Sequence, residues 1–299
     1  MKKRQIVITG ADGQLGLTFR GNWSTSGLAK KYELVCGGFD HIDITSRASV
    51  ESKLCPDNVS VIVNFAAYTG VEKAENEEER SYRVNQLGVK VLAAWAKEAN
   101  CKLIHISTDF VFSGEKESPY LTTDNTNPLN VYGKSKLEGE NEILKAELES
   151  STIIRTSWLY SQFRTNFVKT MLRLMSERES LNVVNDQIGS PTSTDSIVEL
   201  IFAMLKSGDY AGTYHWSDIG NISWYEFAVA IQRLGLEFGI LTRSIQILPI
   251  GSEKYPTKAL RPKYSVLDIN LAKNKFSLVP QLWDTRLRHV IKRIAQNYP

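Results

Sequence analysis

The sequence predicts an α/β protein in which a doubly wound parallel sheet is joined to a smaller α/β lobe. Short runs rich in Val and Ile alternate with longer segments of helical periodicity through the first half of the chain. These runs lack the polar alternation of a half-exposed strand. Continuous apolar strands indicate a sheet covered on both faces, and the strand–helix–strand repetition implies right-handed crossovers between parallel strands.

Five strands make up the predicted sheet, at residues 5–9, 33–36, 59–66, 102–107 and 152–157. The clearest helix is predicted at residues 81–99, because its apolar side chains recur at helical spacing along one face. Those side chains are Val84, Leu87, Val91, Leu92 and Trp95. A second helical stretch is predicted from Tyr132 to about Glu149.

The pattern of predicted helices and strands changes after about Leu159. Further helices are predicted at residues 166–177, 195–206, 224–234 and 283–296, and further strands at residues 181–184, 213–216 and 245–249. We expect residues 1–160 to form mainly the sheet domain and residues 161–299 to form mainly the smaller lobe. Segments at about residues 180–206 are expected to return to the sheet domain.

Composition and charge restrict the class of partner. The chain has 299 residues, of which 42% are hydrophobic and 23% charged, the profile of a folded protein of about two lobes. Its net charge of +3 is scattered, whereas nucleic acid or an anionic membrane needs a clustered basic face. Uninterrupted apolar stretches fall short of the roughly 20 residues that span a bilayer, and the run at residues 6–8 is too short for a secretion signal. We expect neither nucleic acid nor a membrane as partner.

The three cysteines favour a reducing compartment. Cys36, Cys55 and Cys101 are odd in number and lack C-x-x-C spacing, so neither a disulfide framework nor a zinc site is indicated. A cytoplasmic location is therefore expected. His and carboxylate residues show no convincing metal-ligand spacing, and we expect no catalytic metal.

A glycine-rich segment stands at the first strand-to-helix junction, residues 9–16 (TGADGQLG). Gly10, Gly13 and Gly16 would permit a tight turn and a side-chain-free approach, so that backbone N–H groups and the helix N-terminus face a pyrophosphate. The G-x-x-G-x-x-G spacing differs from the general dinucleotide fingerprint and is weak by itself. Its position directly after the first buried strand favours a phosphate site.

Tyr132 and Lys136 form a second constellation, since residues four apart on a helix lie one turn apart on the same face. In a chain with 12 tyrosines about one such pair is expected by chance. Thr108, at the end of a predicted buried strand, changes that interpretation. Ligands of doubly wound folds bind at the carboxyl ends of the strands, where Thr108 would lie.

The order of glycine-rich loop, strand-end hydroxyl and Tyr-x-x-x-Lys resembles the extended short-chain dehydrogenase/reductases. Over nearly its whole length the chain more closely resembles the dTDP-4-dehydrorhamnose reductase family. The matching segments are residues 64–69 (NFAAYT), 71–75 (VEKAE), 106–112 (ISTDFVF), 130–136 (NVYGKSK), 155–160 (RTSWLY), 166–171 (NFVKTM), 185–192 (NDQIGSPT) and 261–265 (RPKYS).

This resemblance implies a Rossmann-like dinucleotide-binding domain and a substrate-binding lobe. The implied reaction is reduction of the C4 ketone of dTDP-4-dehydro-L-rhamnose to dTDP-L-rhamnose with NADPH or NADH, the last step of dTDP-rhamnose synthesis for cell-surface polysaccharide. Tyr132 would donate the proton, with its pKa lowered by the charge of Lys136. Lys136 would also bond the nicotinamide ribose, and Thr108 would take the place of the usual Ser at the carbonyl oxygen. The protein would act as a monomer or homodimer.

The same resemblance implies the remaining site residues. The cofactor would be held by Gly10, Gly13, Gln14, Leu15, Gly16, Asp43, Ile44, Ala66, Ala67, Tyr68, Thr69, Tyr132 and Lys136. The substrate would be held by Val71, Thr108, Asp109, Trp158, Asn166, Gln187 and Arg261. Trp158 would pack on the sugar, with a core position as the alternative, and Arg261 suits bidentate phosphate recognition.

One departure bears on cofactor choice. NAD-specific folds place Asp or Glu at the end of the second strand for the ribose 2′-OH, but residues 36–40 here read CGGFD. Gly37 and Gly38 offer no carboxylate, and no Arg stands there for a 2′-phosphate. Use of both NADPH and NADH is therefore predicted.

Two other functions remain open at this point. One is a related enzyme, either another nucleotide-sugar 4-ketoreductase or an epimerase-reductase such as GDP-fucose synthase, which would need an additional Cys and His near the substrate. The segment 107–109 (STD) has no Cys, which disfavours the epimerase-reductase. The other is a non-catalytic dinucleotide-binding regulatory subunit.

The four histidines, His41, His105, His215 and His289, are scattered, and the reductase mechanism needs none of them.

Overall fold

The computed structural model describes residues 3–38 and 41–296. Its centre is a six-stranded, wholly parallel sheet in the order β10-β5-β4-β3-β1-β2. The strands are β1 Arg4–Thr9, β2 Tyr32–Gly37, β3 Val59–Asn64, β4 Lys102–Thr108, β5 Ser151–Thr156 and β10 Gly212–His215. The predicted doubly wound parallel sheet is confirmed, with all five strands of the first half in place.

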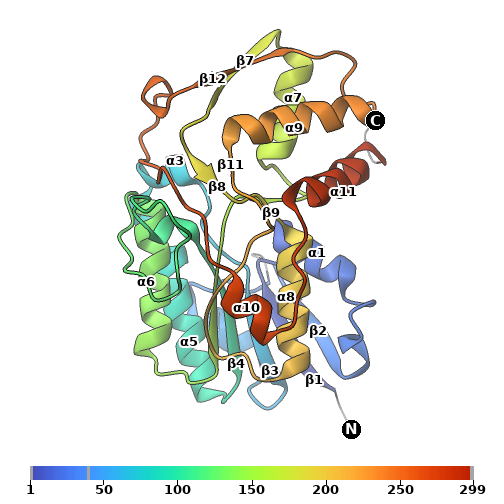
Figure 1. Cartoon of the computed structure of the whole chain (residues 1–299). Coiled ribbons are helices and arrows are strands. Elements are labelled where there is room, and N and C mark those ends of the chain that lie inside the picture. Colours follow the sequence, from blue (N-terminus) through green and yellow to red (C-terminus); the bar gives the residue numbers. More distant parts are fainter. Residues whose placement is uncertain (1–2, 39–40, 297–299) are drawn as a thin grey trace.

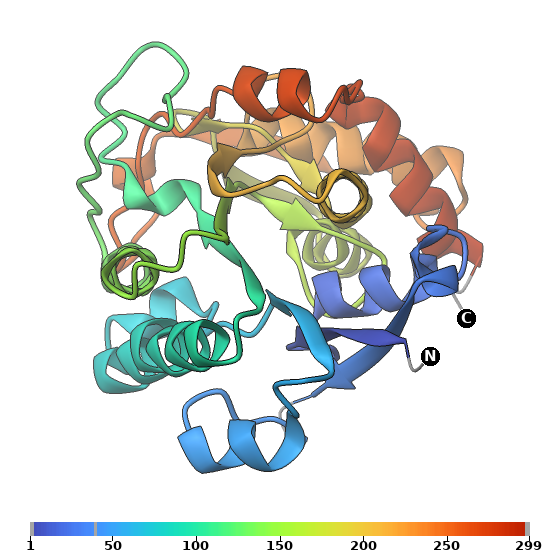
Figure 2. The same ribbon diagram turned by 90° about the horizontal axis from the view of Figure 1, so that it is seen from below.

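Helices cover both faces of this sheet, because successive apolar side chains in each strand point to opposite sides. One face packs on α1 Gln14–Asn22 and α8 Thr194–Ser207. The other packs on α2 Arg47–Lys53, α5 Gly88–Glu98 and α6 Val131–Lys145. Seen from below, the sheet runs between green and teal helices on one side and a yellow-orange helix on the other (Figure 2).

The helix predicted at residues 81–99 is interrupted by a π-helical turn. Its segments are α4 Glu78–Tyr82, the π turn η2 Arg83–Leu87 and α5. The π turn breaks the 3.6-residue register, and Leu87, which the pattern assigned to the apolar face, is 44% exposed. Asn85 in the same turn is instead buried.

The smaller lobe lies above the carboxyl ends of the strands (Figure 1). Its core joins three helices to the parallel pair of β7 and β12. These elements are α7 Phe167–Glu177, β7 Ser180–Val184, α9 Trp224–Glu237, β12 Gln246–Ile250 and α11 Trp283–Gln296. Within the described residues no helix is long and apolar enough to cross a bilayer.

Short elements connect the two parts. Two small sheets pair β6 Leu159–Tyr160 with β9 Thr192–Ser193, and β8 Ile188–Gly189 with β11 Ile222–Ser223. The remaining segments are α3 Val71–Ala74, α10 Asn270–Lys275, η1 Leu28–Lys30, η3 Asp109–Val111 and η4 Ser252–Lys254. The chain returns to the sheet with α8 and β10, both of which follow residue 160. The division of the chain at residue 160 therefore stays a prediction.

Two glycines of α1 offer a matched test of close packing. A Cβ at Gly16 would lie 2.5 Å from both Ala11 Cα and Gly10 O, whereas a Cβ at Gly21 would meet nothing within 4 Å. We expect Gly16→Ala to lower the free energy of unfolding by about 1–3 kcal/mol through overpacking. Gly21→Ala should raise it by about 0.5–1 kcal/mol through helix propensity. Urea denaturation measures both, and equal effects would contradict the packing argument.

Candidate functional site

A cavity of about 630 Å³ opens between the carboxyl ends of β4 and β5 and the smaller lobe. All seven residues predicted to hold the substrate line it, namely Val71, Thr108, Asp109, Trp158, Asn166, Gln187 and Arg261. Gln14, Thr69 and Tyr132 of the predicted cofactor set line it as well. The carboxyl ends of parallel strands are where doubly wound folds bind ligands, so the cavity lies at the expected edge of the sheet.

Thr108 and Tyr132 meet at this edge. Thr108 ends β4, and Asn130 caps α6 by accepting from Gly133 N at 2.8 Å, which places Tyr132 in the first turn of the helix. Burial raises the pKa of Tyr132 to about 12, and its hydrogen bond with the Thr108 side chain only partly opposes that rise. The hydroxyl therefore keeps its proton at neutral pH. This differs from the lowering by Lys136 that the family resemblance implied.

Lys136 is directed at β4 rather than toward Tyr132. Its side chain is buried, and the amine donates to Ile106 O at 2.6 Å and lies 3.3 Å from His105 Nε2. Burial lowers the pKa of Lys136 to about 8, with Glu140 acting in the opposite direction. With this pKa the amine is still mostly charged at pH 7, but it faces Ile106 O and His105, so its charge does not lower the pKa of Tyr132 in this geometry.

Asp109 lies beside Thr108 in a buried position. Thr108 Oγ1 donates to Asp109 Oδ1 at 3.1 Å. Burial raises the pKa of Asp109 to about 7, although its hydrogen bonds lower it. Near neutral pH this side chain can donate a hydrogen bond as a carboxylic acid or accept one as a carboxylate.

The glycine-rich loop has the shape of a dinucleotide site. Gly10 has a φ of +61°, and a Cβ there would lie 2.6 Å from Ala66 N, so the loop packs directly on the segment that follows β3. Gly13 begins α1 without a capping side chain, and a Cβ there would meet only Gly10 O, at 3.3 Å. The first turn of α1 can therefore present its N–H groups to a phosphate, and these residues fit a dinucleotide.

The segment predicted beside the nicotinamide is held by the π turn. Asn85 accepts from Tyr68 N at 2.8 Å and donates to Tyr68 O at 3.0 Å. The same amide donates to Ser135 Oγ at 3.0 Å, and Ser135 lies between Tyr132 and Lys136 on α6. The π turn thus ties residues 66–69 to the helix that carries the predicted catalytic pair, as π turns at functional sites often do.

Arg20 lies near the end of β2, a position that sequence order did not reveal. The end of β2 lies against Asp12, because a Cβ at Gly38 would be 2.1 Å from Asp12 Oδ2. Arg20 on α1 pairs with Asp12 at 3.3 Å. A guanidinium therefore stands where the second strand ends, although no Arg stands there in the sequence. Phe39 and Asp40 of that predicted segment lie outside the described residues.

The aromatic wall of the cavity is a pair of tryptophans. Trp158 stacks on Trp224 with ring centroids 3.4 Å apart and planes 7° apart, and both line the cavity. Gly189 leaves room for the indole, because a Cβ there would lie 2.5 Å from Trp158 Cε2. Trp158 therefore packs one ring face in the lobe while its side chain lies at the cavity wall, and its contact with a sugar stays a prediction.

Two of the predicted polar contacts already have protein partners. Asn166 caps α7 by accepting from Lys169 N at 3.2 Å, and its amide donates to Gln14 Oε1 at 2.9 Å across the two lobes. Arg261 pairs with Glu72 at 2.7 Å and remains partly exposed. Both side chains stay at the cavity wall.

Other predicted residues lie outside the cavity wall. Asp43 accepts from Thr45 N at 2.9 Å, and Ile44 is 3% exposed, packed where a Cβ of Gly88 would touch it. The rest of this group are Gly10, Gly13, Leu15, Gly16, Ala66, Ala67, Tyr68 and Lys136. Their predicted role toward a cofactor stays a prediction.

Several cavity residues escaped the sequence analysis. They include Thr156, Thr165, Phe167, Asn182, Trp224, Ser252, Tyr255 and Thr257. Ser252, Tyr255 and Thr257 follow β12, which reaches the cavity only because it pairs with β7. Thr165 adjoins the predicted Asn166 and could have been found from that neighbour; the segment after β12 carries no such signal.

The parallel sheet, the glycine-rich loop and the Thr108, Tyr132 and Lys136 set define a protein of the extended short-chain dehydrogenase/reductase class. The family model described as "RmlD substrate binding domain" matches residues 4–296, and the chain belongs to this family. Among the described residues, no group of three or more His, Cys, Asp or Glu side chains is placed to hold a metal ion.

The relatives match this chain over nearly their whole length. A dTDP-4-dehydrorhamnose reductase of Aggregatibacter actinomycetemcomitans is 38% identical over 96% of this chain and 98% of its own. The dTDP-4-dehydrorhamnose reductase of Escherichia coli strain K12 is 35% identical over 97% of both chains. A crystal structure of dTDP-4-dehydrorhamnose reductase from Bacillus anthracis in complex with NADP has a TM-score of 0.89 and 34% identity, covering 98% of this chain and 100% of its own.

The raised pKa of Asp109 predicts a pH dependence of stability. An acid whose pKa is higher when folded binds its proton more tightly in the folded chain, so stability falls as the pH rises from about 4 to about 7. Asp109→Asn removes that loss, and we expect its free energy of unfolding to exceed that of the wild type at pH 8 by about 1–4 kcal/mol. The two proteins should converge near pH 4.

Urea unfolding at both pH values measures the difference. Asp218, whose pKa burial raises to about 6, remains in both proteins and cancels in the comparison. A difference that stays constant between pH 4 and pH 8 would contradict the buried-acid explanation.

Proposed function

We propose that this chain reduces the C4 ketone of dTDP-4-dehydro-L-rhamnose to dTDP-L-rhamnose with NADPH or NADH. The observation that carries the proposal is the meeting of Thr108 and Tyr132 at the carboxyl end of β4, in a cavity lined by all seven predicted substrate residues. Family membership and the names of the relatives support the same substrate. In this proposal the reaction is the last step of dTDP-rhamnose synthesis for cell-surface polysaccharide.

The proposed chemistry divides between Tyr132 and Thr108. A bound nicotinamide would supply the hydride. Tyr132, protonated because burial raises its pKa to about 12, donates its proton to the sugar oxygen as negative charge develops there. Thr108 Oγ1 donates to Asp109 in the free protein, and with substrate bound it would turn that hydrogen bond to the same sugar oxygen and stabilise it.

The cofactor would lie along the sheet edge. Gly10, Gly13, Gln14, Leu15 and Gly16 are the proposed pyrophosphate contacts, and Asp43 with Ile44 the adenine contacts. The nicotinamide half would lie beside residues 66–69, Tyr132 and Lys136. In this assignment residues 1–160 would form mainly the dinucleotide-binding domain and residues 161–299 mainly the substrate-binding lobe, with segments at about residues 180–206 returning to the sheet domain.

The substrate would occupy the lobe side of the cavity. Trp158 offers an apolar ring to the sugar, while Val71 and Asp109 border the reacting end. Asn166, Gln187 and Arg261 are the proposed contacts of the dTDP moiety, with Arg261 suited to a phosphate. A monomer or homodimer in the cytoplasm remains the predicted state.

Tyr132→Phe tests the proton donor. We expect turnover of dTDP-4-dehydro-L-rhamnose, followed as loss of NADPH absorbance, to fall by about 10²–10⁴-fold, because the general acid is removed. NADPH affinity, measured by calorimetry, should change by less than about threefold, within about 0.7 kcal/mol. Unchanged turnover would overturn the assignment.

Further measurements distinguish the proposed reductase from the alternative functions. GDP and UDP counterparts of the substrate should react far more slowly, and deuterium from solvent at C3 or C5 of the sugar would indicate an epimerase-reductase instead. A chain that binds NADPH, turns over none of these sugars and co-purifies with a larger synthetase would be a regulatory subunit.

Arg20→Ala tests the cofactor side. We expect the Kd for NADPH to rise about tenfold or more, because the guanidinium at the end of β2 would pair with the 2′-phosphate. The Kd for NADH should stay within about twofold, since it lacks that phosphate. Arg173→Ala is the matched control, an exposed arginine on α7 that pairs with Glu177. Equal weakening of both cofactors would contradict this role.

A further inference from the structure

A row of buried polar side chains crosses the sheet beside Lys136. Thr9, Asn64 and His105 are register partners on β1, β3 and β4, each no more than 1% exposed. Thr9 Oγ1 donates to Asn64 Oδ1 at 2.6 Å, and Asn64 Nδ2 lies 3.0 Å from His105 Nδ1. The row ends at Lys136, whose Nζ is 3.3 Å from His105 Nε2. The proposed mechanism uses none of these first three residues.

The orientation of the Asn64 amide follows from the backbone. Ala66 N–H can only donate, and it lies 3.1 Å from the atom assigned as Asn64 Oδ1. That atom must therefore be the oxygen, which also accepts from Thr9. The amide nitrogen consequently faces His105, and an amide nitrogen can only donate.

This orientation selects one tautomer of His105. Because Nδ1 accepts from Asn64, it carries no proton. Burial lowers the pKa of His105 well below its usual range, so the ring is neutral. Its single proton is then on Nε2, the nitrogen that faces the Lys136 amine.

A lysine ammonium offers three donors and no acceptor, so Nε2–H and a charged Lys136 would place two donors face to face. The neutral amine has a lone pair that accepts from Nε2–H. It also keeps two N–H groups, one of which donates to Ile106 O at 2.6 Å. The neutral form therefore satisfies both observed contacts.

We propose that His105 is a positioning residue that donates from Nε2 to Lys136 and favours its neutral amine, with Thr9 and Asn64 fixing the tautomer. The role in catalysis rests on the proposed function, but the hydrogen-bond direction does not. Among the described residues, the charged or titratable groups that face Lys136 are His105 from β4 and Glu140 from its own helix. Glu140 is in turn paired with Arg155 of β5 at 2.6 Å.

The tautomer can be read directly from the ¹⁵N shifts of the imidazole nitrogens, because the chain has only four histidines. We expect wild-type His105 to carry its proton on Nε2 between pH 6 and pH 8, about the range in which histidines usually titrate. His105→Gln identifies the signals by their loss. A proton on Nδ1 in the wild type overturns the proposal, whatever any variant does.

Asn64→Asp reverses the two hydrogen bonds between residue 64 and Lys136, while Thr9 still donates to residue 64. A carboxylate accepts from Nδ1–H, so the His105 proton should move to Nδ1 and leave Nε2 to accept from the ammonium. The titration midpoint of Lys136, followed by its ¹³Cε shift and assigned with Lys136→Arg, should rise by about one unit or more, a tenfold change in proton affinity. An unchanged midpoint, or a rise with the proton still on Nε2, overturns the proposal.

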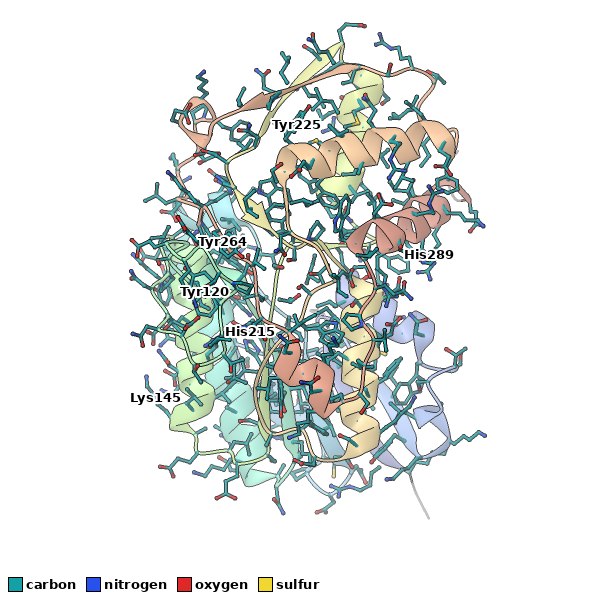
Figure 3. All side chains as sticks on the ribbon, viewed as in Figure 1. Tyr120, Lys145, His215, Tyr225, Tyr264 and His289 are labelled. Carbon is teal, nitrogen blue, oxygen red and sulfur yellow. The ribbon has the colours of Figure 1, made fainter. Side chains whose placement is uncertain are left out.

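Two further variants control for structural damage. His105→Gln keeps one acceptor and one donor in the same order, so the Lys136 midpoint should stay within about half a unit. His215→Phe removes another fully buried imidazole, one whose Nδ1 lies 2.9 Å from Tyr120 O, and should cost stability without moving that midpoint (Figure 3). A His215→Phe shift equal to that of Asn64→Asp would also overturn the proposal. None of these measurements needs substrate, so a failure of the His105 proposal can be distinguished from a failure of the proposed function.

Discussion

The buried ion pair between Glu140 on α6 and Arg155 on β5 determines where the chemistry can take place. Arg155 Nη2 lies 2.6 Å from Glu140 Oε2, and Ser107 of β4 donates to the other oxygen of the same carboxylate. Both charges are almost fully buried, so removing one partner would strand the other at a cost of about 3–5 kcal/mol. The pair therefore locks the register of α6 against two strands.

That register positions the residues that we propose to react. Tyr132, Lys136 and Glu140 are spaced four residues apart, so they share one face of α6 and lie one turn from each other. With Glu140 held at β5 and the Lys136 amine held at Ile106 O, the first turn of the helix must lie over the end of β4. Tyr132 consequently meets Thr108 at the cavity, and neither side chain needs a loop to bring it there.

The sequence predicted most of this arrangement because its elements are regular. Apolar runs identified the strands, and the rule that ligands bind at the carboxyl ends of parallel strands joined Thr108 to the glycine-rich loop. Helical spacing placed Tyr132 and Lys136 on one face. The family resemblance added the lobe residues, whose positions at the cavity wall follow from contacts far apart in sequence, such as Asn166 with Gln14.

What the sequence did not predict depends on departures from regularity or on burial. The π turn at Arg83–Leu87 shifts the helical register by an inserted residue, which a 3.6-residue pattern treats as unbroken helix. Trp224 reaches the cavity only by stacking on Trp158, and Arg20 reaches the end of β2 only because α1 folds back beside it. The Lys136 amine faces His105 at the end of the buried row of Thr9, Asn64 and His105, and no spacing in the sequence reveals this row.

Burial also explains how a nearly neutral protein can hold anionic ligands. Desolvation moves Tyr132, Lys136 and Asp109 toward their neutral forms, so this part of the site carries less charge than the same groups would carry in water. The two arginines proposed for phosphates, Arg20 and Arg261, already pair with carboxylates and remain partly exposed. The Arg20–Asp12 pair is exposed, and an exposed pair is worth only about 0–1 kcal/mol, whereas the Arg261–Glu72 pair is more buried. Exchange of the carboxylate for a phosphate at Arg20 therefore costs little, while each pair keeps its guanidinium oriented, and no clustered basic surface is required.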